Sequence, residues 1–392
     1  MACPRLWREV QPLLYSRVVG FLARASQALL MALEARHSAA RCHMQVYVDD
    51  PAITMAGTVR QRLESVNCLL LFWLCLGVPL AWRKGMLTPG TGHQWIGVRY
   101  QVLAPGQVEL TLPAPFLEGL VKLLDMVMRK GHIPESKAKQ LMGKAARVSH
   151  IAPESRPWVG ALFAAVSGAQ AAARAGRREA PPGQLACSRM RPAVRWLLAL
   201  VRGGDSDVIV PLRRLVFSSL PTPDPQARRI EFDASPWGGG GVLYVDNVAK
   251  EWFALQWEAS DASHLKAVPG DCSWQSFYEM CTLVIALTLW ANSTDNTATL
   301  GDSMVALQNA MKLKGSTALM AVARELAWRK AKHGWLFTAG HLPAEANVVA
   351  DALSRLSGPD PQAVPRVLGK ARYRQVPPLR ALWQVPKDPR SS

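Results

Sequence analysis

Four acidic residues lie where a carboxylate could do chemistry, and Asp233 is the first of them. It interrupts the strand-like stretch 230–234, which is followed by the glycines 238–241 and a second apolar stretch, 242–245. This pattern predicts a β-hairpin whose turn contains the glycines. A carboxylate in an apolar strand is costly to bury unless an opposite charge compensates it, and a bound metal ion can do so. Asp233 is therefore a candidate metal ligand.

The other three acids lie on predicted helices or where a strand meets a helix. Glu279 is the only acid in the helix-length run 274–290, and its i+4, i+7 and i+11 positions are apolar, so it should point inward. Asp302 falls at a predicted junction between a strand and a helix, where open sheets bind their ligands. Asp351 shares a predicted helix face with Asn347, four residues before it. The chain thus offers acids in the order Asp, Glu, Asp, Asp.

In this order, residues 226–357 resemble the ribonuclease H domain of retroelement polyproteins. The most specific motifs are Phe-Asp-Ala-Ser at 232–235 and Ala-Asp-Ala-Leu-Ser-Arg at 350–355. The resemblance implies two bound Mg²⁺ or Mn²⁺ ions, which activate a water and stabilise the leaving oxygen when the RNA strand of an RNA–DNA hybrid is cut. By motif match, the catalytic and metal-binding residues are Asp233, Glu279, Asp302 and Asp351.

The same resemblance adds two polar residues near the end of this domain. His341 lies where relatives often carry a catalytic histidine on a mobile loop, although an exposed loop histidine without a role fits the sequence equally well. Asn347 lies on the predicted helix face of Asp351 and is a candidate for contact with the nucleic acid.

A second pair of acids lies near the N-terminus, in the sequence Tyr-Val-Asp-Asp at 47–50. Adjacent carboxylates at a bend repel each other unless water solvates both or a cation lies between them. The motif resembles the metal-binding turn of reverse transcriptases, which makes Asp49 the principal metal ligand and Asp50 its neighbour. The resemblance extends to three nucleic-acid-binding candidates. Lys84 would assist the pyrophosphate leaving group or be a plain surface lysine, and a predicted primer-grip hairpin holds Trp95 and Gly97.

The polymerase resemblance is incomplete. The family needs a third aspartate from a strand upstream of the Asp-Asp turn, yet no aspartate precedes Asp49. The sequence therefore predicts an N-terminally truncated polymerase that does not extend primers, joined to a working nuclease. Two alternatives stay open at this point: a non-catalytic nucleic-acid-binding remnant, and an RNA-directed DNA polymerase whose missing segment is restored.

The composition favours a nucleic-acid partner. A net charge of +17 and a pI near 10.0 suit a polyanion such as an RNA–DNA hybrid or a primer–template. The 7 cysteines show no pattern typical of a zinc knuckle or a disulfide framework. Residues 66–82 carry no charge but are too short for a bilayer, so we predict a buried helix, no membrane partner and an intracellular protein, cytoplasmic or nuclear. Nothing in the sequence indicates an oligomeric state.

The predicted fold class is mixed α/β, with a five-stranded sheet in the ribonuclease H-like part and helices on both of its faces. The lysines of the preceding helical region are available to phosphates or lie on solvated faces. The predicted segments are 1–105, a partial polymerase palm; 106–170, a thumb or connection region; 171–225, a basic tether rich in proline and arginine; 226–357, the ribonuclease H-like domain; and 358–392, a basic, proline-rich, extended tail.

Overall fold

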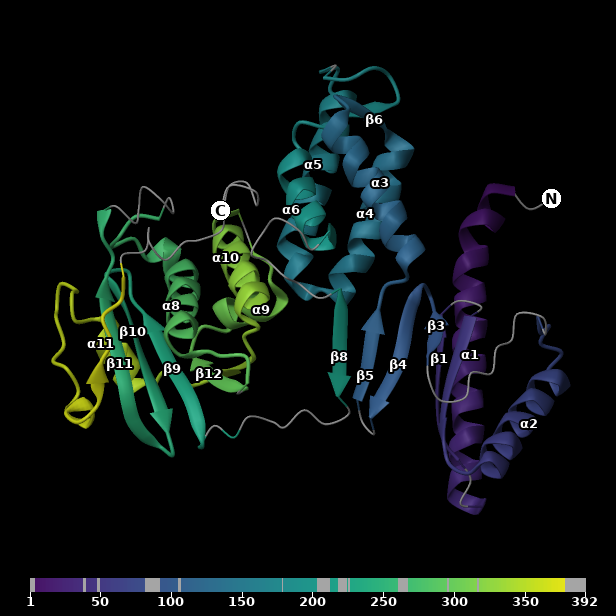
Figure 1. Cartoon of the computed structure of the whole chain (residues 1–392), viewed down its shortest axis with the longest axis horizontal. Coiled ribbons are helices and arrows are strands. Elements are labelled where there is room, and N and C mark those ends of the chain that lie inside the picture. Colours follow the sequence, from purple (N-terminus) through teal and green to yellow (C-terminus); the bar gives the residue numbers. More distant parts are fainter. Residues whose placement is uncertain are drawn as a thin grey trace. The chain divides into compact units, whose positions relative to one another are not determined.

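The computed structural model divides the chain into two compact units, Met1–Leu103 and Ala104–Ser392. Figure 1 labels most of the helices and strands of both units. The residues that the structure describes are 4–37, 40–47, 50–81, 92–104, 107–177, 179–202, 212–217, 224, 226–259, 267–294, 296–315 and 317–377. Two predicted site residues, Asp49 and Lys84, lie outside these ranges.

The first unit contains two hairpins and two helices within its described part. Its core holds Leu30, Met44 and Trp73, and the Trp73 indole donates to Ser26 Oγ at 2.8 Å. Thr58 begins the second helix with a capping box, in which it and Gln61 satisfy each other's backbone N–H groups. The elements are α1 (Pro4–His37), β1 (Arg41–Tyr47), β2 (Asp50–Ala56), α2 (Val59–Cys75), β3 (His93–Trp95) and β4 (Val98–Ala104).

The uncharged run 66–82 overlaps a helix, α2, but the prediction that this helix is buried is wrong. Helix α2 ends at Cys75, and only one of its faces is buried, as at Leu69. Leu71 and Leu74 on another face are more than half exposed. The reason is that α2 packs on α1 along one side. An uncharged run therefore indicates a helix, but it does not show that every face of the helix is buried.

One stretch of the described residues, Arg17–Ala35 in α1, is long and apolar enough to cross a membrane by length and composition. It lies near the N-terminus and is mostly unburied. Core helices of soluble proteins and signal sequences pass the same test, so this single stretch is weak support for a membrane span.

The second unit begins with a group of helices and short strands. Buried apolar residues such as Leu124, Leu141 and Leu162 recur along its helices at the spacing of one helix face. The elements are β5 (Gln107–Thr111), α3 (Ala114–Arg129), β6 (His132–Pro134), α4 (Glu135–Ile151), η2 (Pro153–Ser155), α5 (Arg156–Arg174), β7 (Gln184–Ala186), α6 (Arg191–Arg202) and β8 (Arg213–Phe217).

The structure differs from the predicted tether over much of 171–225. Strand β7 pairs with β6, β8 pairs with β5, and α6 packs on α3 and α5. Trp196 of α6 is buried and stacks on Trp158 of α5, with ring centroids 4.5 Å apart. Proline clusters do end helices, but the short run 191–202 has an apolar face, and this face is buried against α3 and α5. The described part of this segment is therefore folded.

The rest of the second unit is a mixed sheet with helices on both faces, as the α/β prediction required. The strand order is β13-β12-β9-β10-β11-β14, with β9 to β11 antiparallel and β12 parallel to both β9 and β13. The strands are β9 (Arg228–Ala234), β10 (Gly238–Val245), β11 (Val248–Gln256), β12 (Thr297–Gly301), β13 (Phe337–His341) and β14 (Arg372–Tyr373).

The helices of this part divide between the two faces of the sheet. Figure 1 shows α8, α9 and α10 grouped beside the strands, where their apolar residues form one core with β9. Helix α11 packs on β9 and β10 through a separate cluster that contains Val242 and Leu353. The helices are η3 (Cys272–Trp274), α8 (Gln275–Trp290), α9 (Met304–Lys312), α10 (Thr317–His333), α11 (Val348–Ser354) and η4 (Arg366–Leu368).

Two details of the predicted domain are corrected. The four glycines form the first half of β10 and not a turn; the turn is 235–237. A Cβ on Gly240 would lie 2.4 Å from Leu353 Cβ, and one on Gly239 would lie 2.4 Å from Thr282 Oγ1. Because α11 and α8 approach the strand so closely from its two faces, only glycine fits there.

The sheet has six strands and not five, because part of the predicted tail is ordered. Residues 358–377 are described, Leu368 is buried, and β14 pairs in parallel with β11. The Tyr373 ring lies 4.8 Å from that of Trp252, and Arg374 N donates to Trp252 O at 2.8 Å. The extended tail is thus a prediction only for the residues after 377.

Candidate metal centre

Three of the four predicted ligands meet at one edge of the large sheet. Carboxylate oxygens of Asp233, Glu279 and Asp302 all lie within 4.8 Å of one another. Asp233 is 4% exposed and Glu279 is 2% exposed, whereas Asp302 is half-buried. Three separate elements thus assemble a small, largely buried acidic cluster.

The topology explains why these residues meet. Strands β9 and β12 are parallel neighbours, so their carboxyl ends lie at the same edge of the sheet. Asp233 is the last residue but one of β9, and Asp302 directly follows β12. Helix α8 packs on β9 and brings Glu279 to this edge from near its N-terminal end.

Neutral side chains hold the two buried carboxylates. Ser354 Oγ donates to Asp233 Oδ2 at 2.8 Å. Gln275 Nε2 donates to Glu279 Oε1 at 2.9 Å and to Ala234 O at 2.5 Å. The second oxygen, Glu279 Oε2, is buried without a hydrogen-bond partner in the described part of the chain. One buried oxygen of the cluster therefore lacks a donor.

The environment opposes the negative charge of both buried acids. Burial raises the pKa of Asp233 to about 7, with the charges of Asp302 and Asp351 adding to it and the Ser354 hydrogen bond acting against it. Burial and then the neighbouring charge of Asp233 raise the pKa of Glu279 well above its usual range. Both shifts have the sign expected where carboxylates share a poorly solvated site, and a bound cation would reverse them.

The donor set fits a divalent cation. Mg²⁺ and Mn²⁺ prefer carboxylate oxygens, and Mg²⁺ binds them at about 2.1 Å, so oxygens on opposite sides of one ion lie roughly 4.2 Å apart. The spacing of the three acids, all within 4.8 Å, is compatible with that geometry. The unpartnered Glu279 Oε2 is an oxygen that such an ion would satisfy.

The fourth predicted ligand, Asp351, is not part of this group. Its Oδ1 accepts a hydrogen bond of 2.7 Å from Arg355 Nε, one helix turn further along α11. It still lies near enough to raise the pKa of Asp233 through its charge. The structure therefore places Asp351 beside the cluster, in an ion pair of its own.

Asn347 does not lie where a nucleic-acid contact requires it. The residue is 1% exposed, and its Nδ2 donates to Phe232 O at 3.1 Å. It precedes the first turn of α11, which starts at Val348, so it is not on the helix face predicted for it. The buried amide connects the start of α11 to Phe232 of β9, the residue before Asp233. Its role in the structure is therefore to hold these two elements together.

His341 is the exposed last residue of β13 and pairs with Gly301, which precedes Asp302. It therefore belongs to a strand end and not to a loop, at the same edge of the sheet as the acidic cluster. A catalytic role for His341 stays a prediction.

The predicted residues of the first unit are only partly described. Asp50 begins β2, and its carbonyl accepts a hydrogen bond of 3.1 Å from Trp95 Nε1. Gly97 has φ of +72° in the turn between β3 and β4, a conformation that favours glycine. The two hairpins of this unit thus touch, while the nucleic-acid-binding roles of Trp95, Gly97 and Lys84 stay predictions.

Searches against protein-family models and against curated proteins find no match. Among solved structures, the chain is similar to RNase H1 from the halophilic archaeon Halobacterium salinarum NRC-1, with 16% identity and a TM-score of 0.26 over 33% of this chain and 96% of that one.

Two further similar structures are of the foamy viral protease-reverse transcriptase. The dRH form in complex with dsDNA matches with 12% identity and a TM-score of 0.32 over 81% of this chain and 48% of that one. The complex with an RNA/DNA hybrid matches with 12% identity and a TM-score of 0.30 over 89% and 40%. The chain spans less than half the length of these two viral proteins. TM-scores this low do not establish a shared fold, so the site rests on the residues of this chain.

Sequence reasoning missed Gln275 and Ser354, the two donors to the cluster. Gln275 precedes Glu279 by four residues, a helical spacing that could have suggested their contact. Ser354 precedes Arg355 within the motif that identified Asp351. No local sequence pattern connects Ser354 with Asp233, which lies more than a hundred residues earlier. The contact between them becomes visible only from the packing of α11 on β10.

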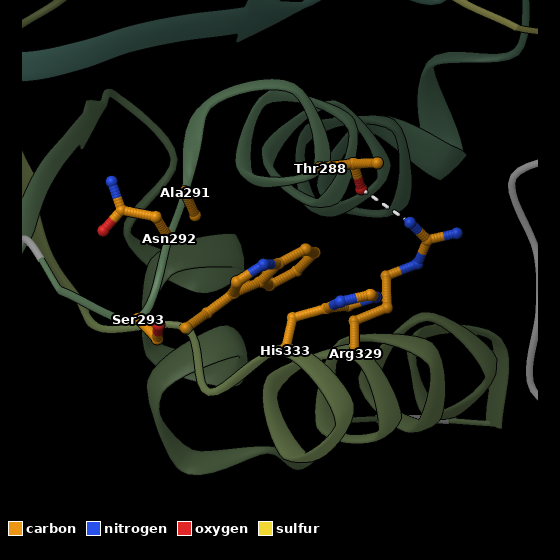
Figure 2. A pocket seen from close by; sticks show the side chains of 7 residues that line it. Thr288, Ala291, Asn292, Ser293, Arg329 and His333 are labelled. Carbon is orange, nitrogen blue, oxygen red and sulfur yellow. Dashed lines mark hydrogen bonds between the residues drawn. The ribbon is translucent and has the colours of Figure 1, made fainter. Parts of the chain in front are cut away.

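A pocket with a cavity volume of about 460 Å³ lies at the other end of α8. Thr288 at its wall is nine residues after Glu279, about 13 Å along the helix. Figure 2 shows the Arg329 guanidinium directed at Thr288 Oγ1, at 2.9 Å, with the His333 ring beside it. Burial, Lys332 and Arg329 lower the pKa of His333. The pocket contains none of the clustered acids, so it is separate from the candidate metal centre.

Proposed function

We propose that this chain cleaves the RNA strand of RNA–DNA hybrids with Mg²⁺ or Mn²⁺, through a ribonuclease H-type site in its second unit. One observation carries the proposal: two buried acids, Asp233 and Glu279, lie with Asp302 in one cluster whose oxygens are within 4.8 Å of one another, and one buried oxygen has no donor. A cluster of this kind is unfavourable by itself and favourable around a cation.

The residues of the cluster would divide the work among them. Asp233, Glu279 and Asp302 would bind the ions, and Asp351 would complete the set once its carboxylate leaves Arg355. Bound ions supply activation of a water and stabilisation of the leaving oxygen. Gln275 keeps Glu279 Oε1 in place, so that the free Oε2 keeps one orientation. His341, at the same sheet edge, would move protons for the departing strand.

The charge of the chain supports the choice of substrate. With +17 overall, the protein attracts the phosphates of a duplex, and basic side chains would release condensed counterions on binding. We place the activity inside the cell, in the cytoplasm or the nucleus, with a hybrid or a primer–template as partner. The first unit offers only Asp49 and Asp50 at its turn, too few ligands for a two-ion site, so the chain should not extend a primer.

The test is a cleavage assay on an RNA–DNA hybrid with a labelled RNA strand. We expect cleavage with Mg²⁺ or Mn²⁺, none with a chelator, and a loss above about 100-fold for Asp302→Asn, since a direct ligand should matter more than a supporting group. Asp49→Asn is the matched control, because it removes one carboxylate from the other unit, and it should retain full activity. A wild-type protein that binds hybrid but leaves it intact would overturn the proposal, as would primer extension lost on Asp49→Asn.

A further inference from the structure

Within the described residues, the Asp233 carboxylate accepts a side-chain hydrogen bond from Ser354. Ser354 is fully buried at the end of α11, and its Oγ lies 2.8 Å from Asp233 Oδ2. The same Oγ lies 2.9 Å from Asp351 O in the preceding turn, and Ser354 O accepts a hydrogen bond of 2.6 Å from Ser235 Oγ. Two contacts therefore tie Ser354 to the strand end that carries Asp233.

The glycines of β10 fix this arrangement sterically. A Cβ on Gly240 would lie 2.9 Å from Ser354 N, and one on Gly238 would lie 3.0 Å from Ser354 O. The backbone at Ser354 thus rests directly on the strand that pairs with β9. The hydroxyl has little freedom to move, so it presents one fixed donor position to Asp233.

A hydroxyl is suited to orienting a metal ligand because it carries no charge. It satisfies one oxygen of Asp233 and fixes the plane of the carboxylate, while the negative charge remains for a cation. A lysine or arginine at that place would neutralise Asp233 and compete with the ion. We propose that Ser354 is a positioning residue of the metal centre, which sets the orientation of Asp233 for ion binding. This inference rests on the proposed function of the same site.

Ion binding can be measured without cleavage, by calorimetric titration of Mn²⁺ into the metal-free protein. Ser354→Ala should weaken Mn²⁺ binding about 10- to 100-fold, the usual cost of losing a supporting hydrogen bond to a metal ligand. In the cleavage assay, the same variant should need correspondingly more Mg²⁺ for half-maximal rate. Its rate at saturating Mg²⁺ should fall by a smaller factor, because Ser354 acts on ion binding.

Ser155→Ala is the matched control. Ser155 is also fully buried, and its Oγ likewise lies close to the backbone carbonyl three residues earlier, Ala152 O at 2.8 Å, but it lies in the helical part of the unit. It should leave Mn²⁺ binding unchanged. A folded Ser354→Ala protein that binds Mn²⁺ like the wild type would overturn the inference, as would a wild type that binds no Mn²⁺.

A variant of closer size covers the case in which Ser354→Ala does not fold. Ser354→Cys keeps the side chain nearly the same size with a much weaker donor, so binding should weaken by about three- to tenfold. Unchanged binding by this folded variant would overturn the inference. If the wild type binds Mn²⁺ and Ser354→Ala binds it less, but neither protein cuts a hybrid, the positioning role holds and the proposed nuclease function fails.

Discussion

Glu279 on α8 and Glu325 on α10 are equally buried acids, but their negative charges are compensated differently. Each residue is 2% exposed. Glu325 Oε1 accepts a hydrogen bond of 2.6 Å from Arg329 Nε, so a cation of the same helix balances its charge. Glu279 has the neutral Gln275 on one oxygen and two further acids nearby. Burial alone thus does not make an acid a candidate ligand; missing charge compensation does.

Breaking the internal pair should give the largest effect on stability. In Arg329→Met, buried Glu325 loses the guanidinium that donates to its Oε1, which should lower the free energy of unfolding by about 3–5 kcal/mol. Chemical denaturation of the metal-free protein measures it. Hybrid cleavage by the protein that remains folded should persist, since Arg329 contacts Thr288, near the opposite end of α8 from Glu279. A neutral effect on stability would remove the contrast between the two acids.

Removing charge from the cluster should act in the opposite direction. Asp233→Asn keeps a polar group of the same shape but deletes an ionised carboxylate that the fold disfavours, so the metal-free protein should gain roughly 4 kcal/mol at pH 8. The same variant should lose hybrid cleavage and Mn²⁺ binding. Equal destabilisation by Asp233→Asn and Arg329→Met would mean that the cluster is already balanced inside the chain.

The pH dependence of stability follows from the same pKa shift. The folded pKa of Asp233 is about 7, above its ordinary 3.8, so the folded state keeps this proton while the unfolded state loses it. The contribution is therefore most favourable below about pH 4 and is lost as the pH rises to about 7. Thermal melts of metal-free protein across this window should show a downward slope, flatter in Asp233→Asn. Saturating Mg²⁺ should flatten it as well, because the ion holds the ionised form.

A variant that changes the packing beside the cluster without changing any charge should have the smallest effect on stability. Gly240→Ala forces a methyl group against Leu353 and Ser354, so α11 must shift, at a cost of about 1–3 kcal/mol and with weaker ion binding. Gly143→Ala in α4 is the control, because nothing lies within 4 Å of its added methyl group, and it should stabilise by about 0.5–1 kcal/mol. Mn²⁺ titration of both variants shows whether the site depends on that close approach.

Much of the second unit could be predicted because its signals are local. The run 274–290 becomes α8 with Glu279 pointing inward, and Asp302 follows a strand, both as periodicity and junction position indicated. The prediction of a turn at the glycines of β10 is wrong. A glycine run usually marks a turn, but here glycine is required because helices distant in the sequence pack closely on the strand. The i, i+4 spacing of Asp351 and Arg355 is compatible with an ion pair, but the motif favours Asp351 as a metal ligand.

The two-residue strand β14 has a practical consequence for anyone who cuts the chain into fragments. It occupies the outer side of β11, where an unpaired strand would otherwise offer its N–H and C=O groups to another molecule. A fragment that stopped at 357, where the predicted ribonuclease H-like segment ends, would uncover that edge together with the Trp252 ring. Such a fragment is expected to associate through its sheets, whereas one that continues to 377 carries its own edge protection.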